Sequence, residues 1–365
     1  MPAWHQTAAA RRLGVTYPIV QGPFGGGHSS AELTAAVSNL GGLGSFGARG
    51  LAPQDIGSVV ADIRRRTSAP FAINLWMSLE DDGAAAVTRE EFEHALAPLL
   101  PLYREFGVTP PVFAGPQSPD VAAQIQAVID ARVPVFSFIF GIPDAAVLDE
   151  CRRHGIVTVG AATSVEEAIA LEAAGVDAIV ASGFEAGGHR PSFLDTADAN
   201  LTGLFGLVPQ VVDAVRIPVI AAGGIADGRT VAAALMLGAS GVQVGTAFLA
   251  CEESNVAPAH RAALFGPERK QSVLTRGFSG RLARGLRNRL SDYVNALPAT
   301  LPYPLPIRLI DPLVRAGRTG ERSEIMPLFA GQNAALVRHR RAADVFAALL
   351  AETDALLQES HGVSS

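Results

Sequence analysis

An alternation of short apolar runs with Ala- and Leu-rich segments of helical period constrains the fold of this chain more than any other feature. The runs are apolar on both faces and end in glycine or another small residue, as expected of parallel strands covered by helices. Eight of them are predicted to be strands, at residues 18–22, 42–46, 71–75, 133–140, 157–161, 178–181, 218–222 and 241–245. This alternation predicts an α/β fold, a (β/α)8 TIM barrel.

Helix-capping residues support the alternation. Ser164, followed three residues later by Glu167, has the pattern of a capping box at the start of a helix. Asp227 likewise precedes an Ala-rich helix, which we expect to end at Gly238.

The alternation stops after residue 250, which divides the chain into three predicted parts. Residues 1–250 are predicted to form the barrel that carries the binding site. Residues 251–330 mix Pro, Arg and Gly with amphipathic pieces, and we expect them to form a smaller lid domain inserted after strand eight. Residues 331–360 contain a helical pattern from Gln332 to Leu357, which is predicted to be a C-terminal helix returning to the barrel.

Composition and charge argue against several classes of function. The net charge of −6 gives no broad basic surface for nucleic acid, and no apolar run reaches the roughly 18 residues of a membrane span. The cysteines Cys151 and Cys251 can form neither a disulfide framework nor a zinc cluster, so we expect a cytoplasmic protein. The single lysine, Lys270, lies outside every predicted strand, which argues against Schiff-base and pyridoxal phosphate chemistry.

Two glycine turns at the ends of strands seven and eight are predicted to bind a phosphate group. Barrel enzymes place their sites at the carboxyl ends of the strands, and the loops after these two strands commonly bind phosphate through main-chain N–H groups. Strand seven runs into Gly223 and Gly224, and strand eight ends in Gln243-Val244-Gly245-Thr246. Because glycine lets the main chain approach an anion closely, the two turns together indicate a phosphate site.

His189 is the candidate catalytic residue. Strand six continues into Ser182 and a flexible loop in which Gly187 and Gly188 precede His189. A histidine at this end of a barrel can act as a general base or donate a hydrogen bond to a developing anion near neutral pH. The alternative is a histidine satisfied by a main-chain carbonyl group. Glu185, in the same loop, is expected to orient the loop rather than to react.

The other strand ends suit a flat ring such as a flavin. The loop after strand one contains Gly22, Pro23 and Phe24 and would let a ring lie against the main chain, while strand three offers Asn74. Paired carboxylates and a His-X-His pattern are missing from the strand ends, which argues against a glycosidase and a metal-dependent hydrolase. We therefore expect no metal site.

These motifs resemble those of the nitronate monooxygenase family, formerly called 2-nitropropane dioxygenases. The segments that carry the resemblance follow one another along nearly the whole chain: PIVQGPFGG from Pro18, VFSFIFG from Val135, EAGGH from Glu185, AAGGI from Ala221, GT from Gly245 and TRGFSGR from Thr275. The Gly-Gly-His loop combined with the two phosphate turns is the most specific part. The resemblance implies a flavoprotein monooxygenase that binds the nucleotide FMN in a barrel with a smaller lid domain.

The resemblance also implies roles for individual residues. His189 would interact with substrate beside the flavin. The implied FMN contacts are Asn74, Ser182, Gly187, Gly224, Gln243, Val244, Gly245 and Thr246, the last four meeting the phosphate end. The chain departs from the family pattern at two points: Pro191 stands where members often carry glycine, and Ser182 stands where many carry glutamine. Both changes imply a pocket of different shape.

The implied reaction is oxidation of an alkyl nitronate by O2 to a carbonyl compound and nitrite, with electrons passing through the flavin and no nicotinamide. The nearest alternative is an NAD(P)H-dependent reductase of quinones or enoyl thioesters on the same barrel, because such reductases share the Gly-Gly-His loop. A third hypothesis is a flavin-free phosphate-binding barrel, which would give a colourless protein. Apolar lid segments are also compatible with a homodimer.

Overall fold

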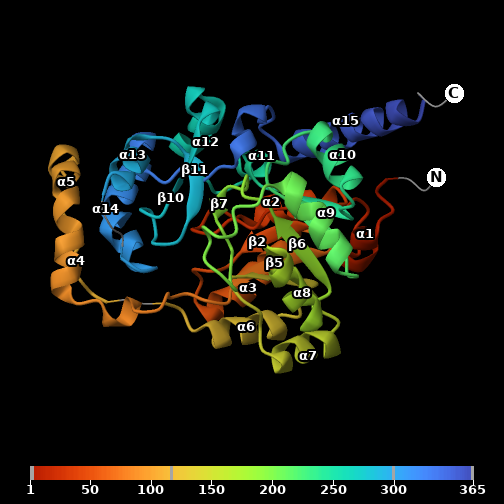
Figure 1. Cartoon of the computed structure of the whole chain (residues 1–365), viewed down its shortest axis with the longest axis horizontal. Coiled ribbons are helices and arrows are strands. Elements are labelled where there is room, and N and C mark those ends of the chain that lie inside the picture. Colours follow the sequence, from red (N-terminus) through yellow and green to blue (C-terminus); the bar gives the residue numbers. More distant parts are fainter. Residues whose placement is uncertain (1–3, 116–117, 298–300, 363–365) are drawn as a thin grey trace.

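The computed structural model describes residues 4–115, 118–297 and 301–362. Its centre is a barrel of eight parallel strands in the order β1-β9-β8-β6-β5-β4-β3-β2 (Figure 1). The strands are Ile19–Gln21 (β1), Gly44–Gly47 (β2), Phe71–Trp76 (β3), Val135–Ile139 (β4), Val157–Ala162 (β5), Ala178–Ser182 (β6), Val219–Ala222 (β8) and Gly241–Val244 (β9). The predicted TIM barrel is confirmed, and each of these strands overlaps a predicted one.

Neighbouring residues close the barrel between β1 and β2. Leu43 forms a parallel bridge with Val20, and its amide donates a hydrogen bond to the Ile19 carbonyl group at 2.9 Å. Regular pairing starts one residue later, at Gly44. A Cβ atom at Gly44 would lie 1.8 Å from the Thr34 carbonyl oxygen, so only glycine lets the covering helix pack this closely on the strand.

Helices cover the outside of the barrel. They are Ala8–Leu13 (α1), Ala31–Asn39 (α2), Pro53–Arg66 (α3), Val121–Asp130 (α6), Ala145–Arg153 (α7), Val165–Ala173 (α8), Leu204–Ala214 (α9), Gly228–Met236 (α10), Thr246–Leu249 (α11) and Ala342–Gly362 (α15). Short 3-10 helices are Ala84–Ala86 (η1), Ala97–Leu99 (η2), Pro267–Lys270 (η3), Ser323–Ile325 (η4) and Gln332–Leu336 (η5). None of the described helices is long and apolar enough to cross a membrane.

The predicted helix caps are right in one case and half right in the other. Asp227 forms a complete capping box with Thr230 at the start of α10. Ser164 accepts the Glu167 amide at the start of α8, but the Glu167 carboxylate turns away and accepts the Thr163 amide at 2.6 Å instead of the Ser164 amide. The other carboxylate oxygen accepts the Phe193 amide at 2.5 Å and the Leu194 amide at 3.2 Å, which links the helix to the loop after His189. That is a tertiary role that local sequence does not reveal.

A second apolar cluster lies beside the barrel and joins two distant parts of the chain. Figure 1 shows Arg89–Leu96 (α4) and Leu100–Phe106 (α5) next to Arg289–Asn295 (α13) and Leu305–Thr319 (α14), on the side away from both termini. Phe92 and Leu102 pack in one cluster with Leu290 and Leu313. The segment 89–106 therefore packs with part of the predicted lid. The lid boundaries, 251–330, stay a prediction, and residues 298–300 lie outside the described residues.

A small antiparallel sheet connects the barrel to the segment after it. Its strands are Gly188–His189 (β7), Ser272–Thr275 (β10) and Ala283–Leu286 (β11), in the order β10-β11-β7. Pro258–Phe265 (α12) lies between β7 and β10 in the chain. The loop after β6 is thus held as the edge strand of a second sheet, which fixes the position of His189.

The C-terminal helix starts later than the sequence pattern predicts. Residues from Gln332 form only η5, and α15 begins at Ala342, whose amide donates to the Glu253 carboxylate at 3.0 and 3.2 Å. The predicted start at Gln332 is therefore wrong, because the segment between η5 and α15 is tied to the region after β9. The helix itself does return to the barrel and packs on α10 and α2.

Candidate functional site

A cavity of about 460 Å³ lies at the carboxyl ends of the barrel strands. His189 lines it, together with all the cofactor-binding residues predicted from the sequence except Val244: Gly22, Pro23, Phe24, Asn74, Ser182, Gly187, Gly188, Gly223, Gly224, Gln243, Gly245 and Thr246. Val244 is buried in the barrel wall, where its carbonyl group accepts the Gly22 amide at 2.9 Å. The fold therefore brings the predicted residues together around one space.

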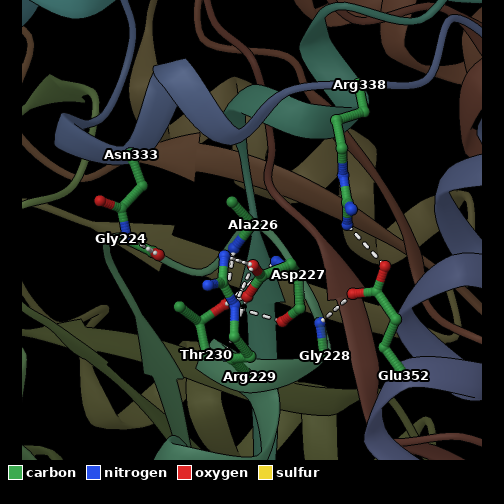
Figure 2. Close-up of polar contacts among 9 residues, drawn as sticks. All are labelled: Gly224, Ala226, Asp227, Gly228, Arg229, Thr230, Asn333, Arg338 and Glu352. Atoms are coloured by element: carbon green, nitrogen blue, oxygen red, sulfur yellow. Dashed lines mark hydrogen bonds and ion pairs between the residues drawn. The ribbon is translucent and has the colours of Figure 1, made fainter.

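The turn after β8 presents main-chain N–H groups to the cavity. Gly223 and Gly224 have φ angles of 122° and 67°, in the region that favours glycine. Asn333 steadies the turn by donating from Nδ2 to the Gly224 carbonyl group at 2.6 Å (Figure 2). In the described part of the chain, the amides of Gly224 and Ile225 have no acceptor. They remain available to an anion.

The N-terminus of α10, which follows this turn, is already occupied by carboxylates. Asp227 Oδ1 and Glu352 Oε2 accept main-chain N–H groups of its first turn, at 3.1 and 2.9 Å (Figure 2). Arg229 and Arg338 pair with the two carboxylates, at 2.5 and 2.6 Å. An anion at this helix end would meet two carboxylates. The N-terminus of α10 is therefore unsuited to a phosphate group, and the glycine turns remain as the expected position.

The turn after β9 completes a cradle for an anion. A Cβ atom at Gly245 would meet no atom within 4 Å, so a side chain there would project into open space. Among the residues described, no acceptor pairs with the Gly245 amide. Thr246 Oγ1 accepts the Gly331 amide at 2.9 Å and anchors the segment at Gly331 beside the turn. Unpaired amides around open space fit a phosphate group.

The middle of the cavity is lined by neutral polar side chains. Asn74 Nδ2 donates to Ser137 Oγ at 3.1 Å, and Ser182 and Gln243 line the same space. Gly22 lies so close to the β9 turn that a Cβ atom on it would be 3.3 Å from the Gly245 Cα atom. Side chains of this kind can hydrogen-bond the heteroatoms of a ring without adding charge.

The loop that carries His189 is held more tightly than its two glycines suggest. Gly188 and His189 pair with Arg284 and Ala283 of β11. A Cβ atom at Gly187 would lie 2.4 Å from the Ala330 carbonyl carbon, so glycine there permits close packing. Glycine at these positions lets the main chain form a sheet edge against a neighbouring segment.

His189 faces aromatic rings and one hydroxyl group. Its Nε2 and Ser279 Oγ lie 2.7 Å apart, and its ring centroid is 5.1 Å from that of Trp76 and 5.4 Å from that of Phe329. Nδ1 has no hydrogen-bond partner among the described residues, so it remains available to a ligand. The alternative of a histidine satisfied by a main-chain carbonyl group does not describe this side chain.

The surroundings keep His189 neutral. Burial lowers the pKa of His189 to about 3, and the positive charges of Arg49 and Arg281 contribute to the same shift. An uncharged imidazole can take part in a hydrogen bond at physiological pH, but a pKa this low makes it a weak base, and it supplies no positive charge to a bound anion.

Arg190 is a structural residue that the sequence analysis did not single out. Its guanidinium donates to the carbonyl groups of Ser182, Asn200 and, at 3.3 Å, Thr163. Burial lowers the pKa of Arg190 to about 10, which leaves it charged near neutral pH. It ties the end of β6 to the loop that follows His189. Glu185 has the orienting role expected of it, since its carboxylate accepts the Leu204 amide at 2.8 Å.

Arg49, Trp76 and Tyr303 were missed as site residues. The Arg49 guanidinium lies 4.9 Å from the Trp76 ring centroid and 5.3 Å from that of Tyr303. Arg49 and Trp76 line the cavity. Trp76 ends a barrel strand and Arg49 follows one, so their positions in the sequence could have identified them as site residues. Tyr303 lies more than 200 residues from both in the sequence and follows no barrel strand, so its position carries no such indication.

Comparison with known proteins relates nearly the whole chain to one family of enzymes. A family profile described as nitronate monooxygenase matches residues 7–352. A protein of Staphylococcus aureus (strain JH9), described as a probable nitronate monooxygenase, is 36% identical over 357 residues, covering 97% of this chain and 99% of that protein.

Solved structures show the same architecture. The nitroalkane oxidase of Streptomyces ansochromogenes has a TM-score of 0.87 and 36% identity, with 98% of this chain and 100% of that chain covered. FabK from Thermotoga maritima has a TM-score of 0.76 and 26% identity, with 98% and 99% covered.

Proposed function

The chain belongs to the nitronate monooxygenase family of flavin-dependent oxidoreductases, and we propose that it uses FMN to oxidise alkyl nitronates with O2 to a carbonyl compound and nitrite. The observation that carries the proposal is the single cavity in which the unpaired amides of the glycine turns and the neutral His189 lie together. The family membership itself confirms the resemblance found in the sequence.

The residues that line the cavity fit FMN at its phosphate group, at its ring and beside the ring. The amides at Gly224 and Gly245 would hold the phosphate group, and the neutral side chains of Asn74 and Ser182 would contact the ring. His189 would stand beside the ring. Bound FMN would supply the electron acceptor that none of the twenty side chains provides.

Within this proposal His189 positions the substrate. Nε2 is engaged by Ser279 Oγ, while Nδ1 is available in the cavity. A neutral ring can donate a hydrogen bond to a nitronate oxygen. Trp76 and Phe329 flank the ring and exclude water around it.

Anaerobic mixing of the purified protein with propionate 3-nitronate tests the proposal. We expect the nitronate alone to reduce the flavin and nitrite to appear when air is admitted. His189→Asn should keep the flavin absorbance and lose most of the turnover. A purified protein without flavin absorbance would contradict the proposal and return the chain to the phosphate-binding hypothesis.

A second candidate function is an NAD(P)H-dependent flavin reductase of quinones or enoyl thioesters. The similarity to FabK over nearly the whole chain supports it, at lower identity than the similarity to the nitroalkane oxidase. Rapid bleaching of the flavin by NADH or NADPH, with no response to nitronate, would favour this function. The cytoplasmic location, the homodimer and the absence of nucleic-acid partners stay predictions.

A further inference from the structure

Arg49 brings a positive charge to the same group of aromatic rings as His189. Arg49 follows β2, and its guanidinium contacts the faces of Trp76 and Tyr303. His189 meets the same two rings, with centroids 5.1 and 6.4 Å away. The guanidinium donates one hydrogen bond to the Tyr303 hydroxyl group. Arg49 and His189 both line the cavity, so a ligand beside the imidazole is also near the cation.

This charge has no carboxylate partner. Arg281, which also contacts Tyr303, is paired with Asp81 at 2.7 Å. By contrast, Arg49 has no carboxylate within ion-pair distance in residues 4–115, 118–297 and 301–362. The guanidinium has five N–H groups, and among the same residues the Tyr303 hydroxyl group is the one acceptor that they reach. A cation that is partly withdrawn from water and unpaired is costly, and an anion in the cavity would offset that cost.

We propose that Arg49 forms an anion-binding subsite that receives the two oxygens of a nitronate and favours the anion over the neutral nitroalkane. This inference rests on the proposed function and names its substrate class: a planar monoanion with a small apolar substituent. The two oxygens of a nitronate are spaced like those of a carboxylate, which the guanidinium fork binds with two parallel hydrogen bonds.

Arg49 and His189 have different roles in this proposal because they differ in charge. The imidazole is neutral, so it cannot attract an anion. Arg49 and Arg281 are the arginines whose charges act on His189, and of these two only Arg49 lacks a carboxylate partner among the described residues. Arg318 also lines the cavity without such a partner, but its charge acts on His28 instead. The cavity is also lined by Phe278, Phe329 and Ile307, which can accept an alkyl group. A neutral nitroalkane would gain the apolar contacts and lose the ion pair.

The alternative is that Arg49 serves only to support Trp76 and Tyr303 through cation–π contacts. Arg49→Lys tests the guanidinium fork, since lysine keeps the charge and can still make cation–π contacts but cannot form two parallel hydrogen bonds. Arg315→Gln is the matched control, because Arg315 lines the same cavity but is paired with Asp311. Tyr303→Phe removes the hydroxyl partner of Arg49 and leaves the guanidinium charge in place.

The first measurement uses nitrate, a planar anion that does not react, and follows both the flavin spectrum and the thermal midpoint of the holoenzyme at constant ionic strength. We expect Arg49→Gln to weaken nitrate binding about tenfold or more, equivalent to about 1.4 kcal/mol. Arg49→Lys and Tyr303→Phe should each show a smaller loss than Arg49→Gln, and Arg315→Gln should bind nitrate like the wild type. Wild-type nitrate affinity in a folded Arg49→Gln variant would overturn the inference.

The second measurement is steady-state turnover. Nitrate should compete with nitronate, and Arg49→Gln should raise the KM for nitronate more than it lowers kcat. The preference for nitronate over its parent nitroalkane should fall in the same variant. If Arg49→Gln does not fold, lack of competition between nitrate and nitronate in the wild type overturns the inference. Nitrate binding that depends on Arg49, in a protein that does not oxidise nitronate, would instead refute the proposed function.

Discussion

Substitution of Gly245 tests the phosphate position most directly, because the structure separates its effect on binding from its effect on folding. A Cβ atom at Gly245 meets no protein atom within 4 Å, so Gly245→Ala should leave the stability of the flavin-free protein nearly unchanged. The same methyl group would occupy the space beside the unpaired amides. Losing one hydrogen bond to a charged phosphate is worth about 1.5–3 kcal/mol, or roughly ten- to a hundredfold in affinity.

Gly187→Ala is the matched control. Its Cβ atom would lie 2.4 Å from the Ala330 carbonyl carbon and 2.5 Å from the Gly331 nitrogen, and both are main-chain atoms. Overpacking of this kind costs about 1–3 kcal/mol, so this variant should lose thermal stability even without flavin.

The assay combines the thermal midpoint of each flavin-free variant with the Kd of FMN, measured by quenching of flavin fluorescence. We expect Gly245→Ala to keep its midpoint and lose affinity, and Gly245→Asp to lose more affinity because it adds a negative charge. Gly187→Ala should lower the midpoint. Stoichiometric FMN with wild-type affinity in Gly245→Asp would refute the proposed phosphate position.

Three further predictions follow from His189, from the buried histidines and from Arg190. His189→Ala should retain FMN and lower kcat roughly 10²–10⁴-fold, and loss of FMN with normal turnover in reconstituted protein would contradict its role. The pKa values of His28, His189 and His260 fall to about 4, 3 and 3, chiefly by burial. These values lie below the unfolded value of about 6.5. Their neutral forms therefore contribute stability above pH 6.5 that is lost as the pH falls towards 4, and thermal midpoints should decline over that window, less steeply in His260→Asn. Arg190→Lys should lower the free energy of unfolding by about 1–3 kcal/mol, measured by urea titration, because one ammonium group cannot reach its three carbonyl partners.

The sequence predicted those features that depend on local pattern. The strands could be located because each is apolar on both faces, and the glycine turns because main-chain approach to an anion requires small residues. The start of α10 was predictable because the Asp227 side chain accepts the amide of Thr230, only three residues later in the chain.

Features that depend on contacts between distant segments were not predictable. The pairing of His189 with Ala283, the packing of residues 89–106 on α14, and the ties between Glu253 and Ala342 all join segments far apart in the chain. Each requires the fold to be known before the partners can be found. Gly187 shows the consequence: the same glycine fits a flexible loop and a tight sheet edge, and only its neighbour at Ala330 distinguishes them.

The two ends of the cavity are suited to negative charge by different means. At the glycine turns the hydrogen-bond donors are main-chain amides. Asn333 holds the turn after β8, and the Glu352 carboxylate holds the start of α10 that follows it. Donors fixed in this way suit a ligand that stays bound. Beside His189 the donor is the Arg49 side chain, held by stacking on Trp76, and it suits a ligand that must leave after reaction. Because burial and Arg49 both keep His189 neutral, the imidazole can take part in a hydrogen bond in the cavity without holding an anionic product. The charge that attracts a nitronate therefore also prevents the neighbouring imidazole from becoming a second cation.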